Sequence, residues 1–276
     1  MAAPPPRLDV DRVTRLIEEV STAIVLPRFR ALRQADIHSK ATTGDLDDIV
    51  TIVDHESEAA LTGGLRELLD VPVIGEEAAA ERPELLGTLR EHEVFWLVDP
   101  LDGTRNFASG DEGFGVMVAL VVSGHARAAW VHLPVRRDTF VAEAGAGARL
   151  NGGRLRVPDG PAPTTPEGTI FVRFMPPDRR EMMLARLADR VRPAPACGAA
   201  AVEYTDVLRG RKDFVMYYRL LPWDHAGPAL LLGEAGGVVE HADGRPYSVT
   251  SPNQPTIGAR NHTIASRIRT WIEGVA

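Results

Sequence analysis

The stretch WLVDPLDGTRNF, residues 96–107, begins as an apolar strand and ends in a short polar turn. Its first residues are of the types that fill a buried strand, and Pro100 and Gly103 then force the chain to turn. We therefore expect Asp99 and Asp102 in a stiff loop at the edge of the core. Two carboxylates held this close repel each other unless a proton or a cation lies between them. Oxygen ligands of this kind suit a hard cation such as Mg²⁺.

The composition is that of an ordinary globular protein and argues against several function classes. Apolar residues make up 44% and charged residues 25% of the 276 residues. The formal net charge of −7 argues against nucleic acid or an anionic membrane as the main partner. The single cysteine, Cys197, excludes an internal disulfide. Residues 1–7 lack the apolar core of a signal peptide, and no apolar run approaches the ~20 residues of a membrane helix, so we expect a cytoplasmic protein.

Apolar spacing predicts a mixed α/β (α+β) architecture, with a disordered N-terminus at residues 1–7 and one domain over residues 8–276. Helical spacing covers residues 8–32, where Pro27 should kink or end the helix. Residues 49–53 fit a short strand or a helix start, and Glu58 is expected on the outer face of the next helix. Pro72 predicts a strand at a sheet edge. The predicted strands are 71–74, 93–98, an antiparallel meander of 114–122, 128–133, 139–142 and 148–150, then 169–173, 213–218 and 238–240. The later predicted helices are 54–69, 180–190, 199–209, 223–235 and 264–274.

Acidic side chains stand at the ends of three predicted elements. Glu76 follows one strand, Asp99 and Asp102 end another, and Asp224 begins a helix. Each has an ordinary structural alternative. A glutamate after a strand is usually solvated, an aspartate before a glycine usually makes a turn, and Asp224, like Asp54, could be a helix N-cap.

Two long motifs make the chain resemble the inositol monophosphatase family, within the lithium-sensitive, Mg²⁺-dependent phosphatases. The first is Asp-Pro-(Ile/Leu)-Asp-Gly-Thr-x-Asn-Phe, present at residues 99–107. The second is Trp-Asp-x-Ala-(Ala/Gly) at residues 223–227, followed by a helix into Glu-Ala-Gly-Gly at 234–237. A Gly-Glu-Glu element at 75–77 and the segment 48–54 also match. The resemblance implies the layered α/β/α/β/α sandwich of inositol monophosphatases and fructose-1,6-bisphosphatases.

The resemblance also implies two or three Mg²⁺ ions, with Mn²⁺ as a substitute. Glu76, Asp99 and the backbone carbonyl of Leu101 would hold one ion. Asp99, Asp102 and Asp224 would hold a second, and Glu76 would hold a third through water. Ions that share ligands lie about 3.5–4 Å apart, which is the spacing of two-metal phosphoryl chemistry.

The same resemblance implies how water and phosphate would be bound. Thr104, hydrogen-bonded to Asp54, would orient and deprotonate the attacking water, and Glu76 would be a further catalytic residue. No covalent intermediate is then needed. Backbone N–H groups of Gly103 and Thr104 would bind the phosphate.

Substrate contacts are implied at Asp224 and at the small-residue turn of Gly198 and Ala199. Two positions depart from the family pattern. Arg105 stands where many members have a threonine, and it could bind a second anionic group or point to solvent. Tyr217 stands where inositol-specific members have a glutamate. This residue predicts a pocket of aromatic and cationic character or, alternatively, ordinary packing of a sheet face.

We therefore expect a Mg²⁺-dependent phosphatase that hydrolyses a small phosphate monoester, with inositol phosphate as the family's default substrate. Histidinol phosphate, fructose 1,6-bisphosphate and 3′-phosphoadenosine 5′-phosphate are the alternative substrates. An alternative of another class is a non-catalytic protein of the same fold that binds RNA or the transcription machinery. The resemblance also implies that the protein is a homodimer and that its ligand is a small phosphorylated molecule.

Overall fold

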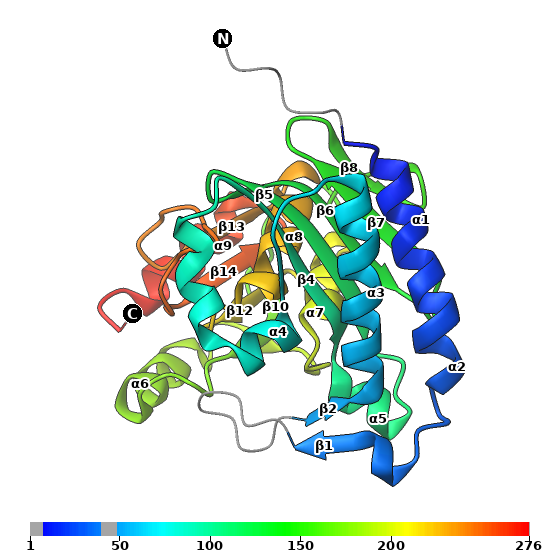
Figure 1. Cartoon of the computed structure of the whole chain (residues 1–276). Helices are drawn as coiled ribbons and strands as arrows, with labels where there is room; N and C mark the ends of the chain where they lie inside the picture. Colours follow the sequence, from blue (N-terminus) through cyan, green and yellow to red (C-terminus); the bar gives the residue numbers. More distant parts are fainter. Residues whose placement is uncertain (1–7, 40–48, 276) are drawn as a thin grey trace.

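The helices and sheets are stacked in space as five layers, in the order helix, sheet, helix, sheet, helix (Figure 1). The computed structural model describes residues 8–39 and 49–275. The α/β/α/β/α sandwich expected from the sequence is confirmed. The segment expected to be disordered, residues 1–7, lies outside the described residues. Within the described ranges, no helix is both long enough and apolar enough to cross a membrane.

The larger sheet has seven strands and carries the aspartate-rich motif. The first pair in the sheet is parallel and all later pairs are antiparallel, so the predicted meander is confirmed. The strand that follows Pro72 lies at the edge of this sheet, as predicted. In sheet order the strands are β3 (Val73–Gly75), β4 (Val94–Asp102), β5 (Gly115–Val122), β6 (His125–Leu133), β7 (Asp138–Glu143), β8 (Gly147–Leu150) and β9 (Gly153–Leu155).

Strand β4 runs further than the sequence predicted, because it includes part of the motif that was expected in a loop. Asp99 pairs with Met117 and Asp102 pairs with Gly115, so two residues of β4 oppose one residue of β5 between these pairs. This β-bulge contains Pro100, which has no N–H to donate to the ladder. The bulge lets the strand continue through a proline that would interrupt a regular ladder.

The first helical layer packs on one face of the larger sheet. It contains α1 (Val10–Val20), the π-helical segment η1 (Ser21–Val25), α2 (Leu26–Arg28) and α3 (Ile52–Leu68). The helix that Pro27 was predicted to end stops one residue after it. A short hairpin of β1 (Ile37–Ser39) and β2 (Ile49–Thr51) precedes α3, so the strand alternative for the start of residues 49–53 was correct. Buried residues of this layer and the sheet form a core that includes Val13, Ile17, Leu61, Leu65, Trp96 and Trp130.

The smaller sheet lies beyond a middle layer formed by α7 (Ala200–Leu208) and α8 (Pro222–Glu234). α6 (Pro177–Leu187) and α9 (His262–Ile272) cover its outer face. Two of its neighbouring strands, β10 and β12, are parallel, so their carboxyl ends lie at the same edge. In sheet order its strands are β11 (Arg192–Pro193), β10 (Glu167–Phe171), β12 (Phe214–Tyr217), β14 (Thr256–Ala259) and β13 (Val238–His241).

Strand β14 was not predicted, although it lies in the interior of the smaller sheet. Its sequence, TIGA, contains a glycine and directly follows Pro255, so its local strand signal is weak. The glycine, Gly258, has a packing role, because a Cβ at this position would lie 2.9 Å from the ring of Tyr204. Tertiary contacts rather than local propensity therefore create this strand.

Replacement of Gly168 by alanine is expected to destabilise the protein. A Cβ at this position of β10 would lie 2.2 Å from the backbone oxygen of Phe214 on β12. Neither backbone can move without disturbing the ladder, so we expect a loss of about 2 kcal/mol in the free energy of unfolding. Gly63→Ala in α3 is the control, since no atom lies within 4 Å of a Cβ there. Urea denaturation measures both variants, and wild-type stability of Gly168→Ala would contradict this account of the β10–β12 contact.

Candidate active site

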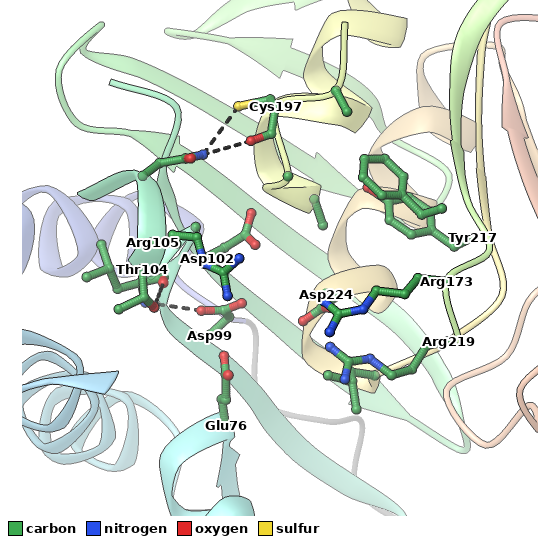
Figure 2. Close-up of a pocket in the computed structure, with 18 of the residues that line it drawn as sticks. Glu76, Asp99, Asp102, Thr104, Arg105, Arg173, Cys197, Tyr217, Arg219 and Asp224 are labelled. Atoms are coloured by element: carbon green, nitrogen blue, oxygen red, sulfur yellow. Dashed lines mark hydrogen bonds between the residues drawn. The ribbon is translucent and has the colours of Figure 1, made fainter. Parts of the chain in front are cut away.

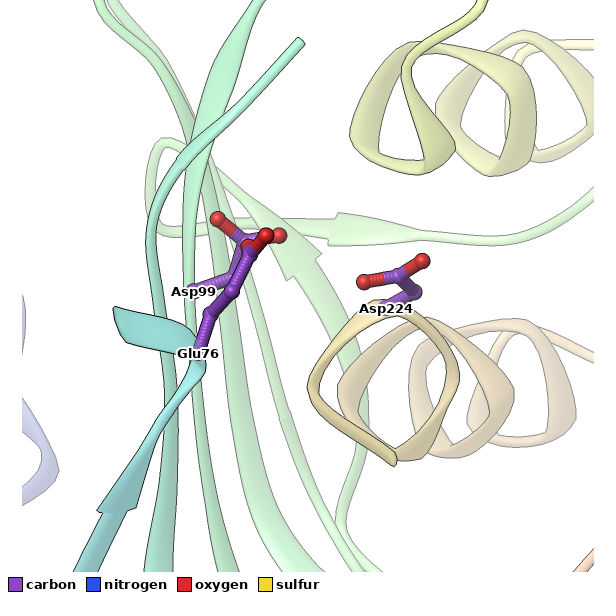
Figure 3. A group of neighbouring side chains, drawn as sticks. All are labelled: Glu76, Asp99 and Asp224. Carbon is purple, nitrogen blue, oxygen red and sulfur yellow. The ribbon is translucent and has the colours of Figure 1, made fainter. Parts of the chain in front are cut away.

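Three carboxylates from separate elements face one another beside the carboxyl end of β4 (Figure 3). Glu76 is the first residue of α4 (Glu76–Glu81), Asp99 lies on β4, and Asp224 lies in the first turn of α8. Each offers a carboxylate oxygen, and these oxygens all lie within 4.8 Å of one another. Asp99 is buried and the other two are half-buried. We call these residues the carboxylate cluster.

The topology explains why the carboxylate cluster forms. β3 and β4 are adjacent and parallel, so Glu76 after β3 and Asp99 on β4 reach the same edge of the sheet. α8 packs across β4, β5 and β6 and places Asp224 opposite them (Figure 3). The positive end of a helix dipole favours a carboxylate in the first turn, as at Glu76 and Asp224. The alternative that Asp224 is an N-cap is wrong, because Leu221 occupies that position and Asp224 is the third helical residue.

Asp102, which was also expected to bind metal, lies outside this group of three. Its Oδ2 accepts a hydrogen bond from the backbone N–H of Ala201 in α7, at 2.6 Å. Burial raises the pKa of Asp102 to about 7, while the hydrogen bond from Ala201 lowers it and the charges of Glu76 and Glu203 raise it. Without a cation, this carboxylate is therefore close to protonation at neutral pH.

A hydroxyl–carboxylate pair joins the end of β4 to α3. Thr104 Oγ1 lies 2.8 Å from Asp54 Oδ1 and 3.0 Å from the carbonyl oxygen of Leu101. The hydroxyl has one hydrogen, so it donates to one of these acceptors at a time. Asp54 Oδ2 accepts hydrogen bonds from the N–H and the hydroxyl of Thr51 at 2.8 and 2.6 Å. Burial raises the pKa of Asp54 to about 6 despite these three donors.

The sequence left open that Asp54 is the N-cap of a helix, and the structure shows that this alternative is wrong. Asp54 does not cap α3, because Thr51 is the N-cap and Asp54 is the third residue of the helix. The two residues form a reciprocal capping box, in which each side chain accepts a hydrogen bond from the backbone near the other. The capping box fixes one Asp54 oxygen and leaves the other directed at Thr104.

A cavity of about 460 Å³ opens over these groups (Figure 2). Its lining includes the carboxylate cluster, Leu101 and Asp102. Ala199 does not line it, since this side chain is buried in the core and the neighbouring Ala200 faces the cavity instead. Arg105 is exposed at the second position of α5 (Thr104–Ser109). Of the residues predicted to bind substrate, the lining contains Gly103, Thr104, Arg105, Gly198, Tyr217 and Asp224.

Tyr217 gives the cavity an aromatic wall. Its ring stacks on Phe171 with centroids 4.8 Å apart and meets His225 edge-on at 4.7 Å. The Tyr217 hydroxyl is buried and has no hydrogen-bond partner among the described residues. Burial raises the pKa of Tyr217 well above its usual value, so the hydroxyl stays protonated. The wall at this position is therefore neutral.

Sequence reasoning missed Glu58, which holds the helix that carries Glu76. The two carboxylate oxygens of Glu58, on α3, accept hydrogen bonds from the backbone N–H groups of Glu77 and Ala78, both at 2.8 Å. These N–H groups belong to the first turn of α4, which Gly75 cannot cap because it has no side chain. A Cβ on Gly75 would lie 2.2 Å from the Glu58 carboxyl carbon, so the glycine makes room for this contact.

The expectation that Glu58 lies on the outer face of its helix is wrong, since this residue is 8% exposed. Its spacing could have revealed this, because Glu58 lies three and seven residues before Leu61 and Leu65, which are buried on the same helix. A carboxylate on the apolar stripe of a helix needs a buried partner, and here the partner is the start of α4.

Two further residues outside the prediction hold the turn that carries Gly198. Glu203 is fully buried, accepts a hydrogen bond from the N–H of Cys197 at 2.6 Å, and pairs with Lys212. From the other side, the Asn106 side chain donates to the carbonyl of Cys197 at 2.9 Å. The turn is therefore fixed between the aspartate-rich motif and α7.

Glu58→Ala is expected to lower the free energy of unfolding by about 2 kcal/mol, because it leaves two N–H groups of α4 without their acceptor. Glu67→Ala is the matched control on the same helix, since Glu67 is exposed. We expect the control to change stability by less than about 0.5 kcal/mol. Urea denaturation compares the two variants. Equal losses would show that Glu58 does not hold α4.

His225, next to Asp224, is held as a neutral imidazole. Its Nε2 lies 3.1 Å from the carbonyl oxygen of Arg219, which can only accept, so Nε2 carries the hydrogen. Nδ1 then accepts from the hydroxyl of Tyr204 at 3.2 Å. Burial lowers the pKa of His225 from 6.5 to about 4, which agrees with this pairing.

Acid is therefore expected to destabilise the metal-free protein through His225. The unfolded chain takes up a proton near pH 6.5 and the folded chain only near pH 4, so this stability is present above pH 6.5 and lost as the pH falls through that window. Between pH 7 and pH 5 we expect a loss of about 2 kcal/mol from this group. Urea denaturation in EDTA should show that the wild type and the control His125→Asn, whose histidine is exposed, lose about 2 kcal/mol more than His225→Asn between pH 7 and pH 5. The raised pKa values of Asp54 and Asp102 act with the opposite sign, but equally in all three proteins, so they cancel in this comparison. The same pH dependence in all three would contradict a neutral His225.

Comparisons with known proteins agree over most of the chain. A family model described as the inositol monophosphatase family matches residues 9–273. The chain is 32% identical over 209 residues to a fructose-1,6-bisphosphatase/inositol-1-monophosphatase of Thermotoga maritima, covering 75% of this chain and 76% of that protein. It is 34% identical over 211 residues to the Nus factor SuhB of Escherichia coli strain K12, covering 74% and 76%. An inositol-1-monophosphatase of Bacillus subtilis is 30% identical over 216 residues, covering 75% and 77%.

Solved structures show the same fold. An IMPase of Thermotoga maritima superposes with a TM-score of 0.79 at 26% identity and covers 96% of both chains. An inositol monophosphatase from Anabaena superposes with a TM-score of 0.76 at 22% identity, covering 97% of this chain and 95% of that one.

Proposed function

Because the chain belongs to the inositol monophosphatase family, we propose that it is a Mg²⁺-dependent phosphatase that hydrolyses a small phosphate monoester. The observation that carries the proposal is the convergence of Glu76, Asp99 and Asp224 within 4.8 Å in a cavity of about 460 Å³. A cavity of this size suits a small molecule. Carboxylates repel a phosphate group, so a phosphate ester would bind beside them only with a cation between the carboxylates and the phosphate.

The donor set fits Mg²⁺, because every candidate ligand is an oxygen. Glu76, Asp99 and Asp224 would hold two or three ions, with the carbonyl of Leu101 and the carboxylate of Asp102 as further donors. Mn²⁺ would substitute, since it prefers the same ligands. When bound, the metal lowers the pKa of a coordinated water and neutralises charge on the phosphate oxygens.

Thr104 and Asp54 would hold the attacking water. When the Thr104 hydroxyl donates to Asp54 Oδ1, 2.8 Å away, its lone pairs are free to accept a hydrogen bond from water in the cavity. Asp54 can then receive a proton through Thr104, because its pKa is raised to about 6. Glu76 is a second carboxylate at the same place. The water would attack phosphorus directly, and no covalent intermediate forms.

The remaining lining would bind the substrate. We propose that the backbone N–H groups of Gly103 and Thr104 contact the phosphate and that Arg105 lies at the mouth of the cavity. Gly198 would contact the rest of the molecule. Tyr217 offers no carboxylate to hydroxyls of an inositol ring, so its neutral ring favours a substrate other than inositol phosphate. Histidinol phosphate, fructose 1,6-bisphosphate and 3′-phosphoadenosine 5′-phosphate remain the candidates.

A second function rests on the relatives. The Nus factor SuhB of Escherichia coli is as similar to this chain as the relatives named phosphatases. A role as a partner of RNA or the transcription machinery is therefore the alternative. The intact cluster of three carboxylates, together with Thr104 and Asp54, favours catalysis, since a protein that only binds a partner has no need to hold carboxylates against their repulsion.

Metal-dependent phosphate release tests the proposal. With Mg²⁺ or Mn²⁺, the purified protein should release phosphate from at least one of inositol 1-phosphate, histidinol phosphate, fructose 1,6-bisphosphate and 3′-phosphoadenosine 5′-phosphate. EDTA should abolish the activity. Asp99→Asn should lower kcat/KM by more than about a hundredfold, because it removes a negatively charged ligand of the metal that would neutralise the reacting phosphate.

Asp70→Asn is the control, because Asp70 is exposed and does not line the cavity. Its activity should stay within about twofold of the wild type. No turnover above the Asp99→Asn background, with every ester and both metals, would contradict the catalytic proposal and leave the transcription-partner alternative.

A further inference from the structure

Two arginines enter the cavity from the smaller sheet. β10 and β12 are parallel and Phe171 pairs with Tyr217, so the residues two places further on, Arg173 and Arg219, leave neighbouring strands at the same edge. Both line the cavity, and their side chains extend into it on the side of Asp224 (Figure 2). The two arginines therefore follow neighbouring strands of the sheet and also line the same cavity.

An aromatic ring fixes the pair. The guanidinium carbon of Arg219 lies 4.0 Å from the centroid of Phe174, and that of Arg173 lies 5.5 Å from the same ring. A phosphate group that lies beside both guanidinium groups would interact favourably with each of them. No carboxylate of the described residues forms an ion pair with Arg219 within 4.0 Å.

Cations line the cavity on two sides. Arg105 follows β4 of the larger sheet, on the same side as Glu76 and Asp99, whereas Arg173 and Arg219 follow β10 and β12 of the smaller sheet. Guanidinium groups bind phosphate through two parallel hydrogen bonds, and a pair of them matches the charge of a phosphate dianion. A cavity of about 460 Å³ has room for more than the reacting phosphate.

We propose that the substrate carries a second phosphate group, which Arg173 and Arg219 bind while the ester to be hydrolysed lies against the carboxylate cluster. This inference rests on the proposed phosphatase function. In the reaction, the oxygen of water forms a bond to phosphorus and the phosphorus–oxygen bond to the alcohol breaks. A proton from the water ends on the alcohol oxygen. The products are inorganic phosphate and an alcohol that keeps its second phosphate.

A simpler role for the two arginines would be to offset the negative charge of Asp224 and the rest of the cluster. That role predicts the same loss for every substrate when an arginine is removed. Binding of a second phosphate predicts a loss that depends on whether the substrate has that group. The ratio of kcat/KM for a bisphosphate to kcat/KM for its monophosphate separates the two roles.

The experiment compares straight-chain diol bisphosphates of increasing length with the monophosphates of the same diols, in the presence of Mg²⁺. The wild-type protein should prefer the bisphosphate of at least one length by about tenfold or more. Arg219→Gln and Arg173→Gln should each reduce that ratio by about tenfold. The control Arg127→Gln, an exposed arginine on β6, should leave the ratio and the activity as in the wild type. Equal preference by the wild type, or an unchanged ratio in both pocket variants, would overturn the proposal.

A binding measurement separates failure of this inference from failure of the proposed function. If neither series is hydrolysed, the panel of four esters described above decides the phosphatase proposal, and calorimetric titration of the diol bisphosphates in Mg²⁺ decides the second site. Tighter binding of a bisphosphate than of its monophosphate, weakened about tenfold in Arg219→Gln, would support it. Equal binding of the two series would overturn it.

Discussion

Glu76, Asp99 and Asp224 repel one another, and the fold must hold their oxygens within 4.8 Å despite that repulsion. At this distance two unit charges repel by about 3 kcal/mol when the effective dielectric constant is about 20. The cost is distributed, because each carboxylate is fixed by a different part of the fold. The β3–β4 ladder, the start of α4 and the start of α8 therefore have to be positioned independently of the charges they carry.

Structural partners around the site have this positioning role. Glu58 accepts two backbone N–H groups of α4 and so fixes the helix on which Glu76 lies. A buried carboxylate placed beside further carboxylates adds to the local negative charge, so this contact is electrostatically unfavourable for the site as a whole. It persists because unsatisfied N–H groups at a buried helix start would cost more. A divalent cation bound to the carboxylate cluster would reduce this repulsion and raise the free energy of unfolding.

The parts that could be predicted from the sequence are those with a local cause. The meander follows from strand-length apolar runs separated by glycine and proline. Asp99 and Asp102 are marked by the proline and glycine of their motif, although both lie on β4 rather than in the loop that was predicted. The partners of Glu58 and Lys212 lie on other elements, so the sequence does not identify them, although the spacing of Glu58 from Leu61 and Leu65 indicates that it is buried. β14 was missed for the same reason, since its neighbours in the sheet create it. Asp102 shows a different limit, because its spacing from Asp99 cannot reveal that Ala201 binds one of its oxygens.

The division of the cavity between two sheets has a consequence for how reaction and specificity are built. The larger sheet supplies the oxygen donors at the end of β4 and the hydroxyl of Thr104 that follows it. The smaller sheet supplies Tyr217 and the two residues that follow its parallel strands, Arg173 and Arg219. These positions can change without altering the oxygen donors of β4, because they belong to a separate hydrogen-bonded ladder. Substitutions at these three positions would change what the cavity recognises while Glu76, Asp99 and Asp224 keep their positions, since those carboxylates are held by other elements.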